Sequence, residues 1–391
     1  MTTTINNEHK KLNVPNLRFP EFQGEWEEYT LQDVVTFSNG KAHENCVNDD
    51  GDYILVNSKF VSTNGQVQKR VTSQLSPLHK SQFVMVMSDL PNGKALAKCF
   101  YVEEDNKYTL NQRVCSFTSN DGNVSRFLMY QINRNKYYLR FDDGINQTNL
   151  KKSEVLSCPV FIPIVREQEK IATLLCKIDE RIATQNKIIE DLKKLKSAII
   201  EIEYSPKDSY HSHIGGAIVQ ISKRNKDNHL CNVLSVSNRQ GFIKQSEQFE
   251  DRNVASDDTS NYKIVEKNDF AYNPARINVG SIARLTKFET GIVSPMYICF
   301  RTKDCLLPEY LELFFESRNF FYHIQKRLEG SVRLCLSYEE LCNIPIVIPS
   351  IEKQKQVDLH LSKLAQKIDL EMKILQFVQQ QKTYLLHQMF I

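Results

Sequence analysis

The sequence predicts an α+β protein in which two similar globular domains are separated by two long helices that pair as an antiparallel coiled coil, in a pseudo-twofold arrangement. Three observations predict this fold. The segment PVFIP at 159–163 returns as PIVIP at 345–349, an offset of 186 residues in a chain of 391. A long run of heptad-spaced apolar residues follows each copy, and short β-branched and aromatic runs precede it. A period this long indicates two large units rather than a solenoid of repeats of about 20–50 residues.

Composition is that of an ordinary soluble globular protein, with 41% hydrophobic and 25% charged residues. The net charge of +3 is nearly balanced, so a phosphate-binding surface would have to come from local clusters of Lys and Arg. The N-terminus lacks the apolar segment of a signal peptide, and no run is long enough to span a membrane, which predicts a cytoplasmic protein. The ten cysteines include no CxxC pair, which favours reduced thiols over disulfides or zinc.

The first domain is predicted over 1–162. Its alternating apolar runs are bounded by Gly, Asn, Asp and Pro, which is typical of strands separated by turns. We expect strands near 52–56, 82–87, 95–101 and 113–117, a helix over 126–139 and a turn at 142–144.

The second domain is predicted over 227–348, after a linker at 205–226 that contains His211 and His213. Two histidines in a linker are a weak indication of a metal site, and solvated linker residues are the simpler interpretation. The second domain repeats the order of segments seen in the first domain. We interpret 230–238 as the repeat of 31–39, 267–270 as that of 80–83, and 330–336 as that of 144–150.

Helices are predicted over 163–204 and 349–391, and residues 166–203 alone would make a helix about 57 Å long. We expect the apolar seam to fix the pairing and the polar residues Arg181, Gln185 and Glu371 near the middle to fix the register. The alternative is two ordinary amphipathic helices, each lying on its own domain. The predicted seam comprises Ile171, Leu174, Ile178, Arg181, Gln185, Ile188, Leu192, Leu195, Ile199, Leu361, Leu364, Ile368, Glu371, Leu375, Val378 and Leu385.

Several enzyme signatures are missing from the sequence. There is no GxxxxGK[ST] phosphate loop, no glycine-rich loop for a dinucleotide or S-adenosylmethionine, and no GxSxG or HExxH. The segment NPAR at 273–276 lacks the second proline and the aromatic ring that would hold a flipped adenine. This favours a binding subunit over an enzyme.

The sequence resembles the specificity subunits of type I restriction-modification systems. The resemblance covers nearly the whole chain. It is carried by the two Pro-x-x-Ile-Pro segments, by the helix starts EQE at 167–169 and KQK at 353–355, by GSVR at 330–333, and by NLRFP at 16–20 followed by Trp26. One departure is that Gln147 stands where the second copy has Arg333.

The resemblance implies that each globular domain is a target recognition domain and that the helices hold the two domains apart like a ruler. It implies a non-catalytic subunit that reads one half-site of a bipartite duplex sequence per domain. The expected partners are double-stranded DNA, two modification subunits that methylate adenine N6, and restriction subunits. S-adenosylmethionine would then belong to the modification subunits, and ATP and Mg to the restriction subunits.

Base reading needs Arg, Lys, Asn and Gln on loops that reach the major groove. Two alternatives stay open, namely a self-contained nuclease or methyltransferase and a coiled-coil scaffold that does not bind DNA. The candidate DNA contacts are Lys41, Asn92, Lys94, Asn111, Gln112, Arg113, Arg134, Lys136, Gln147 and Thr148 in the first domain, and Arg239, Gln240, Asn273, Arg276, Asn278, Arg284, Arg327 and Arg333 in the second.

Overall fold

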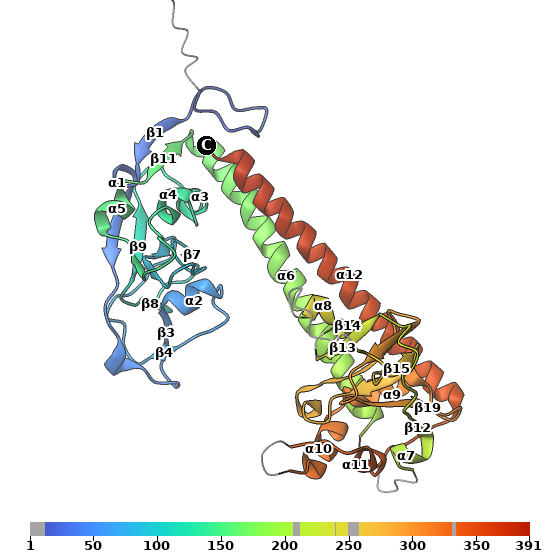
Figure 1. Cartoon of the computed structure of the whole chain (residues 1–391). Helices are drawn as coiled ribbons and strands as arrows, with labels where there is room; N and C mark the ends of the chain where they lie inside the picture. The colour runs from blue at the N-terminus through green and yellow to red at the C-terminus, as the bar shows by residue number, and fades with distance from the viewer. Residues whose placement is uncertain (1–11, 206–211, 239, 249–257, 331–333) are drawn as a thin grey trace, which may run out of the picture. The chain divides into compact units, whose positions relative to one another are not determined.

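The computed structural model describes residues 12–205, 212–238, 240–248, 258–330 and 334–391 (Figure 1). It divides into two compact units. Unit 1 comprises Met1–Gln185 and Ile374–Ile391, and unit 2 comprises Asn186–Lys373. The boundary between the units therefore crosses two helices that are each 39 residues long, α6 (Val165–Glu203) and α12 (Ile351–Met389).

The globular part of unit 1 is built on a four-stranded sheet with strand order β2-β9-β5-β7 and a three-stranded sheet with order β4-β3-β8. Alternate residues of β5 enter two apolar cores, with Phe83 and Met85 in one and Val84 and Val86 in the other. The elements before α6 are β1 (Glu27–Thr30), α1 (Leu31–Val34), β2 (Val35–Asn39), η1 (Glu44–Cys46), β3 (Tyr53–Val56), α2 (Ser58–Ser62), β4 (Arg70–Val71), β5 (Phe83–Val86), β6 (Ser88–Asp89), β7 (Cys99–Tyr101), β8 (Tyr108–Leu110), β9 (Val114–Ser119), α3 (Ser125–Ile132), α4 (Lys136–Leu139), β10 (Thr148–Asn149), α5 (Lys152–Leu156) and β11 (Pro159–Ile162).

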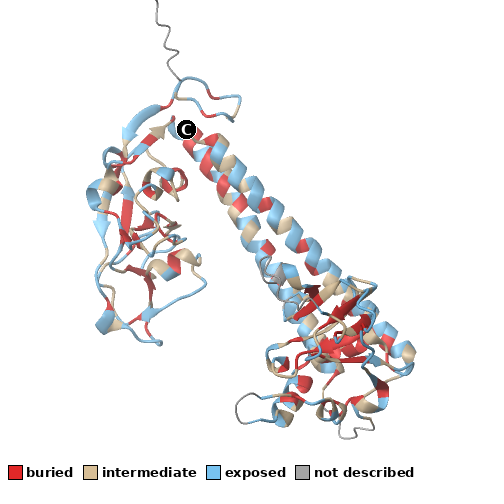
Figure 2. Cartoon of the chain, viewed as in Figure 1, coloured by how far each residue is buried: buried red, intermediate tan, exposed pale blue. Residues whose placement is uncertain are grey.

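Unit 2 has two four-stranded sheets, with orders β12-β19-β16-β17 and β14-β13-β18-β15. Buried residues are concentrated in the strands of both units (Figure 2). The elements between the long helices are α7 (Ile214–Ala217), β12 (Ile218–Ile221), β13 (Val233–Ser237), β14 (Gly241–Lys244), α8 (Gln245–Gln248), β15 (Lys263–Glu266), β16 (Phe270–Tyr272), η2 (Ile277–Val279), β17 (Ile282–Arg284), β18 (Thr290–Val293), β19 (Ile298–Thr302), α9 (Pro308–Phe315), α10 (Arg318–Arg327) and α11 (Tyr338–Cys342).

The two units repeat one topology. The first sheet of each has the same strand order, and β3 pairs with β8 in parallel as β13 pairs with β18. Phe83 and Phe117 face each other across β5 and β9 with ring centroids 4.9 Å apart, and Phe270 and Phe300 do so across β16 and β19 at 5.2 Å. The predicted duplication is confirmed.

The start of the second repeat was predicted wrongly. Part of the predicted linker forms α7 and β12, in which Ile214 is buried and Ile218 pairs with Thr302. This strand takes the place that β2 has in unit 1. Residues 233–237 form β13, the counterpart of β3, so 230–238 does not repeat 31–39. The two segments resemble each other because both have leucine and valine in a similar spacing.

Within each unit the two long helices run antiparallel. In unit 1 the side chain of Asp179 accepts a hydrogen bond from Lys382, while Ile171, earlier on α6, shares a core with Met389 near the end of α12. In unit 2 Ile200 of α6 packs in a core that contains Leu361 of α12, while Glu203, further along α6, forms an ion pair with Lys353, earlier on α12. Residue numbers therefore rise along one helix as they fall along the other.

The seam of α12 agrees with the prediction, because its predicted positions are buried or half-buried. By the same measure the seam of α6 was predicted correctly at Ile171, Leu174, Ile178, Gln185, Leu192 and Ile199, which are buried or half-buried. It was predicted wrongly at Arg181, Ile188 and Leu195, which are exposed. The residues that follow these three, Ile182, Ile189 and Lys196, are half-buried or buried instead, and Leu175 beside Leu174 is fully buried.

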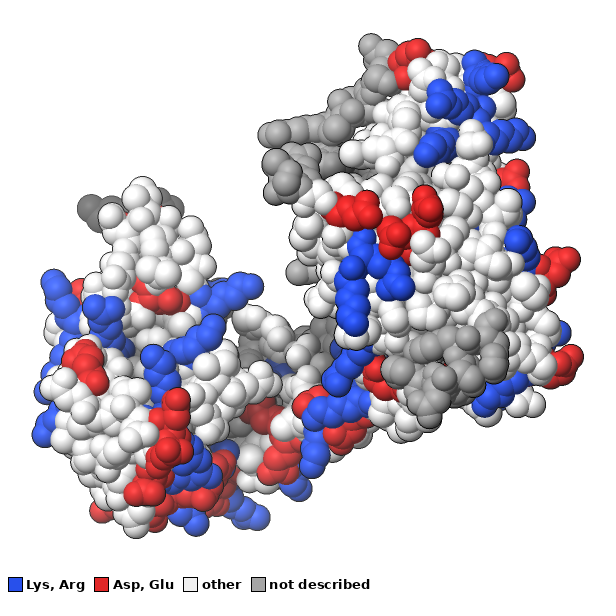
Figure 3. All heavy atoms as spheres, turned by 90° about the horizontal axis from the view of Figure 1, so that it is seen from below, with Lys and Arg blue, Asp and Glu red and all other residues white. Residues whose placement is uncertain are grey.

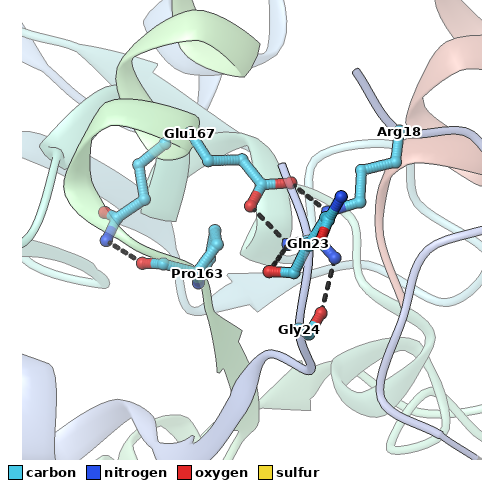
Figure 4. Close-up of polar contacts among 6 residues, drawn as sticks. Arg18, Gln23, Gly24, Pro163 and Glu167 are labelled. Atoms are coloured by element: carbon cyan, nitrogen blue, oxygen red, sulfur yellow. Dashed lines mark hydrogen bonds and ion pairs between the residues drawn. The ribbon is translucent and has the colours of Figure 1, made fainter. Parts of the chain in front are cut away.

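The chain before β1 is fixed to the start of α6. The guanidinium of Arg18 bonds both carboxylate oxygens of Glu167 and the backbone carbonyls of Gln23 and Gly24 (Figure 4). The Leu17 N–H donates to the Gln388 carbonyl oxygen at 2.8 Å. The beginning of the described chain, the first turn of α6 and the last turn of α12 thus meet in unit 1.

Candidate nucleic-acid interface

Three loops of unit 1 lie next to Met87, whose N–H donates to the Arg113 carbonyl oxygen at 2.9 Å and whose carbonyl oxygen accepts from Leu150 N–H at 2.8 Å. We name residues 88–94, 111–113 and 143–149 the unit 1 loop cluster. Strand β6 pairs with β10 at the base of two of these loops. The Gln147 side chain donates to Ser88 Oγ at 2.8 Å, and the Asn92 side chain donates to the Gly144 carbonyl oxygen at 3.2 Å. These bonds bring together candidate residues that are far apart in the sequence.

Asp89 organises the first of these loops. Its Oδ2 accepts from the N–H groups of Ala95 at 2.6 Å and Leu96 at 3.0 Å, and its Oδ1 accepts from Leu90 N–H at 2.9 Å. A Cβ at Gly93 would lie 2.1 Å from Asp89 Oδ2. Only glycine therefore lets the loop close around this carboxylate and leave Asn92 and Lys94 exposed.

The second loop carries Arg113 in a left-handed backbone conformation, with φ of 66°. The Lys41 carbonyl oxygen accepts from Gln112 N–H at 3.1 Å, and Lys41 forms a parallel bridge with Asn111. The side chains of Lys41, Gln112 and Arg113 are exposed, and that of Asn111 is half-buried. Four candidates therefore lie on one short stretch of paired backbone.

The third loop is held by Asp143, whose Oδ1 accepts from the N–H groups of Ile145 and Asn146, each at 2.8 Å. These hydrogen bonds to the ionised carboxylate lower its pKa to about 2. Thr148, at the end of the loop, is buried, so it supports the loop rather than facing solvent.

Arg134 supports the loop cluster from inside unit 1. Its guanidinium donates to the carbonyl oxygens of Leu96 at 3.0 Å and Gly93 at 3.4 Å. The side chain is half-buried, whereas that of Lys136 is exposed at the start of α4. These bonds assign Arg134 to holding the first loop and leave Lys136 as an exposed cation.

In unit 2 the loop after β16 carries three candidates. Asn273 is buried, and its side-chain oxygen accepts from Ala275 N–H at 3.1 Å. Arg276 is exposed at the N-cap of η2, and Asn278 within η2 is half-buried. Arg276 is thus the residue of this loop best placed to reach an external ligand.

Two other arginines of unit 2 are engaged within the protein. Arg284 is only 12% exposed and forms ion pairs with Glu309 and Glu312. Arg327 donates to the carbonyl oxygens of His323 and Asn343, each at 3.3 Å. Gln240 is exposed, and Arg239 and Arg333 lie outside the described residues.

Sequence reasoning selected polar residues and missed exposed apolar ones on the same loops. Leu90 and Ile145 of the unit 1 loop cluster are 69% and 78% exposed, and Val279 of η2 is 56% exposed. Apolar side chains in such positions can contact the methyl group of thymine. The signal in the sequence is a single aliphatic residue among Gly, Asn, Asp and Pro.

Charges of both signs are spread over each unit. Figure 3 shows Lys and Arg on both units, interspersed with Asp and Glu. Within the described ranges no group of His, Cys, Asp and Glu is placed to hold a metal ion. In the same ranges, no helix combines the length and apolar character needed to cross a bilayer.

Comparison with known proteins identifies the fold. Residues 23–194 match the family model "Type I restriction modification DNA specificity domain". Over 97% of its length the chain is similar to 99% of a type I restriction-modification S subunit from M. genitalium, with a TM-score of 0.58 and 15% identity. It is also similar, over 93% of its length, to 97% of a chain from a study of complex assembly and conformational transition of the type I R-M system, with a TM-score of 0.54 and 13% identity.

The matched domain family recognises DNA, and unit 2 repeats the fold of the matched region. The resemblance seen in the sequence is therefore confirmed, and neither the self-contained enzyme nor the scaffold is favoured. Residues 23–194 carry the type I restriction modification DNA specificity domain, and the whole chain shares its fold with a solved type I S subunit, which supports a DNA sequence-recognition subunit.

Proposed function

We propose that the chain reads a bipartite duplex sequence, one half-site per unit, and that other subunits carry out methylation and cleavage. The observation that carries this is the repeated topology with different loops. The two first sheets share one strand order, whereas the loops attached to them differ in sequence and in hydrogen bonding. A shared scaffold with different loops suits two readers of different sequences.

The two readers are residues 1–162 and the part of unit 2 between the long helices. The unit 1 loop cluster reads one half-site, and the loop 273–280 with its neighbours reads the other. Exposed Lys and Arg side chains on these loops supply phosphate contacts, and the Asn, Gln and Arg side chains supply base contacts. The paired helices α6 and α12 set the length of the spacer between the two half-sites.

The modification subunits are the catalytic partners in this proposal. Two of them dock on the repeated parts of the chain, bind S-adenosylmethionine and methylate adenine N6 in each half-site. Restriction subunits that use ATP and Mg join the complex for cleavage. Two like docking sites follow from the internal repeat, because related surfaces accept identical partners.

Mapping of methylated adenines tests the proposal. A genome that carries this gene with its modification subunit should show N6-methyladenine in one two-part sequence with a fixed gap. Exchange of residues 88–94 and 143–149 for the loops of another member should change one half-site and leave the other unchanged. A change in both half-sites, or in neither, would contradict one reader per unit.

Salt dependence separates DNA reading from scaffolding. The assembled complex should lose DNA affinity steeply between about 50 and 200 mM salt, because phosphate contacts release counterions. Lys94→Ala should reduce the slope of log affinity against log salt by about 1. Methylation by the purified chain without partners would instead support the enzyme alternative.

A further inference from the structure

A buried glutamine on the first turns of α6 joins this helix to the start of α3. Gln168 is only 1% exposed. Its Oε1 accepts from Val124 N–H at 2.9 Å, and its Nε2 donates to the carbonyl oxygens of Pro163 at 2.9 Å and Gly122 at 3.5 Å. One side chain thus connects the PVFIP segment, the helix α6 and the loop before α3.

The same arrangement occurs in unit 2. Gln354 on α12 is fully buried. Its Oε1 accepts from Leu307 N–H at 2.8 Å, and its Nε2 donates to the carbonyl oxygens of Pro349 and Cys305, each at 2.9 Å. The hydrogen-bond partners of the two glutamines occupy equivalent positions. In each unit the N–H donor belongs to the N-cap of a helix, and the loop carbonyl that accepts from Nε2 lies two residues before that N-cap.

The residues that receive this contact are not able to cap their own helices. Val124 is the N-cap of α3 and Leu307 is the N-cap of α9, and neither makes a side-chain cap. An N-terminal N–H buried without a partner is unfavourable, and aliphatic residues are poor N-caps. The glutamine of the long helix accepts from the N-cap N–H, which is the role that a Glu or Gln at N3 has in a capping box.

These bonds are directional, whereas the surrounding contacts are not. Ile171 and Leu175 of α6 pack in the same core as Phe127 of α3. Apolar packing holds surfaces together without specifying an angle, because hydrophobic attraction has no direction. Hydrogen bonds weaken steeply when they bend, so a carboxamide bound at both ends fixes the angle between the long helix and the first turn of α3 or α9.

We propose that Gln168 and Gln354 are positioning residues that fix the orientation of each globular part on its long helix and thereby the spacer length that the protein accepts. This inference rests on the proposed bipartite reading. The glutamines themselves contact no base. They determine where the reading loops stand relative to the helix that measures the gap.

The test is methylation by the complete complex on DNA targets whose spacer is one base pair shorter, correct, or one base pair longer. Gln168→Ala and Gln354→Ala should each lower the preference for the correct spacer by about fivefold, as expected from the loss of one or two buried hydrogen bonds. The bases required in each half-site should stay unchanged. Gln356→Ala, an exposed glutamine on the same turn of α12, is the matched control and should keep the wild-type preference.

A wild-type spacer preference in both Gln168→Ala and Gln354→Ala would overturn the inference. A wild-type complex without any bipartite target would instead overturn the proposed function. A second measurement covers variants that lose stability. Hydrogen exchange of the Val124 amide should become faster in Gln168→Ala while that of Phe83 in the sheet does not change. Unchanged exchange at Val124 would also overturn the inference.

Discussion

Arg18 and Glu167 form a two-pronged ion pair, with Arg18 Nε 2.8 Å from Glu167 Oε1 and Arg18 Nη2 2.7 Å from Glu167 Oε2. The Glu167 side chain is fully buried, and that of Arg18 is 14% exposed. The hydrogen bond to this carboxylate raises the pKa of Arg18, and desolvation opposes the rise. The pair fixes the segment before β1 to the first turn of α6.

Removal of the arginine should destabilise unit 1 strongly. Arg18→Met leaves the Glu167 carboxylate buried without its counter-charge, which typically lowers the free energy of unfolding by about 3–5 kcal/mol. Arg18→Met with Glu167→Met should recover much of this loss. Urea unfolding of the chain measures both. Lys170→Met, which removes an exposed pair with Glu21, is the control and should cost at most about 1 kcal/mol. Equal losses in Arg18→Met and Lys170→Met would contradict the assignment.

The register of α6 predicts that alanine substitutions at Ile189 and at Leu195 have different effects on the free energy of unfolding. Ile189 is 7% exposed and Leu195 is 50% exposed. Ile189→Ala should lower the free energy of unfolding by about 2–4 kcal/mol, because it leaves a cavity in the seam. Leu195→Ala should change it by less than about 0.5 kcal/mol. Thermal unfolding distinguishes them, and a larger effect at Leu195 would restore the register predicted from the sequence.

A methyl group at Gly93 should disrupt the unit 1 loop cluster. The new Cβ would collide with the carboxylate of Asp89, which three N–H groups hold in place. Gly93→Ala should cost about 1–3 kcal/mol and weaken recognition of one half-site only. Gly216→Ala, where a Cβ would meet nothing within 4 Å, is the control. Methylation of single half-site variants of the target measures the effect, and loss of both half-sites would argue against a local cause.

Acid should loosen the third loop of the unit 1 loop cluster. The folded pKa of Asp143 lies at about 2, below the ordinary value of 3.8. A depressed carboxylate pKa means that the stabilisation is present above 3.8 and is lost as the pH falls toward 2. The amide resonance of Asn146 should titrate in that window. Asp143→Asn should abolish the titration, and an Asn146 resonance that moves near pH 5 would contradict the hydrogen-bonded turn.

Arg276 and Arg284 should behave differently although both were predicted to contact DNA. Arg276 is exposed, and Arg276→Ala should cost about 1–3 kcal/mol of DNA binding and relax one base position without affecting folding. Arg284 is paired with Glu309 and Glu312, so Arg284→Ala should lower stability by about 1–3 kcal/mol and leave the recognised bases unchanged. Methylation sequencing of both variants measures the change in recognised bases, and unfolding measurements on both give the change in stability.

The duplication and the long helices could be predicted because both leave periodic signals. The seam of α6 was harder, because Leu174 and Leu175, and Ile188 and Ile189, are adjacent apolar pairs that allow two registers. The internal repeat indicates which of the two registers α6 adopts. Moving the seam of α12 back by 186 residues places Leu361 on Leu175 and Ile368 on Ile182, which are the positions that the structure turns inward.

The loop residues were only partly predictable. Residue type identified Asn92, Lys94 and Arg276, which are exposed on loops, but it did not distinguish them from Arg284 and Thr148, which are engaged inside the fold. Pairing with Glu309 and Glu312 depends on how α9 packs against β17, which no local pattern encodes. The helix starts EQE and KQK match in the sequence, but the hydrogen bonds of Gln168 to Val124 and of Gln354 to Leu307 span 44 and 47 residues, and no local pattern predicts them.

Strand β1 pairs with β11 so that Glu27 stands opposite Ile162, and in unit 2 His213 bridges Pro345. The polypeptide therefore enters and leaves each globular part at adjacent points. A domain whose chain ends lie side by side can be replaced by another domain with the same first and last strands, because the replacement does not disturb the helix that follows. New pairs of specificities are then accessible by exchange of whole domains, with no need to redesign what lies between them.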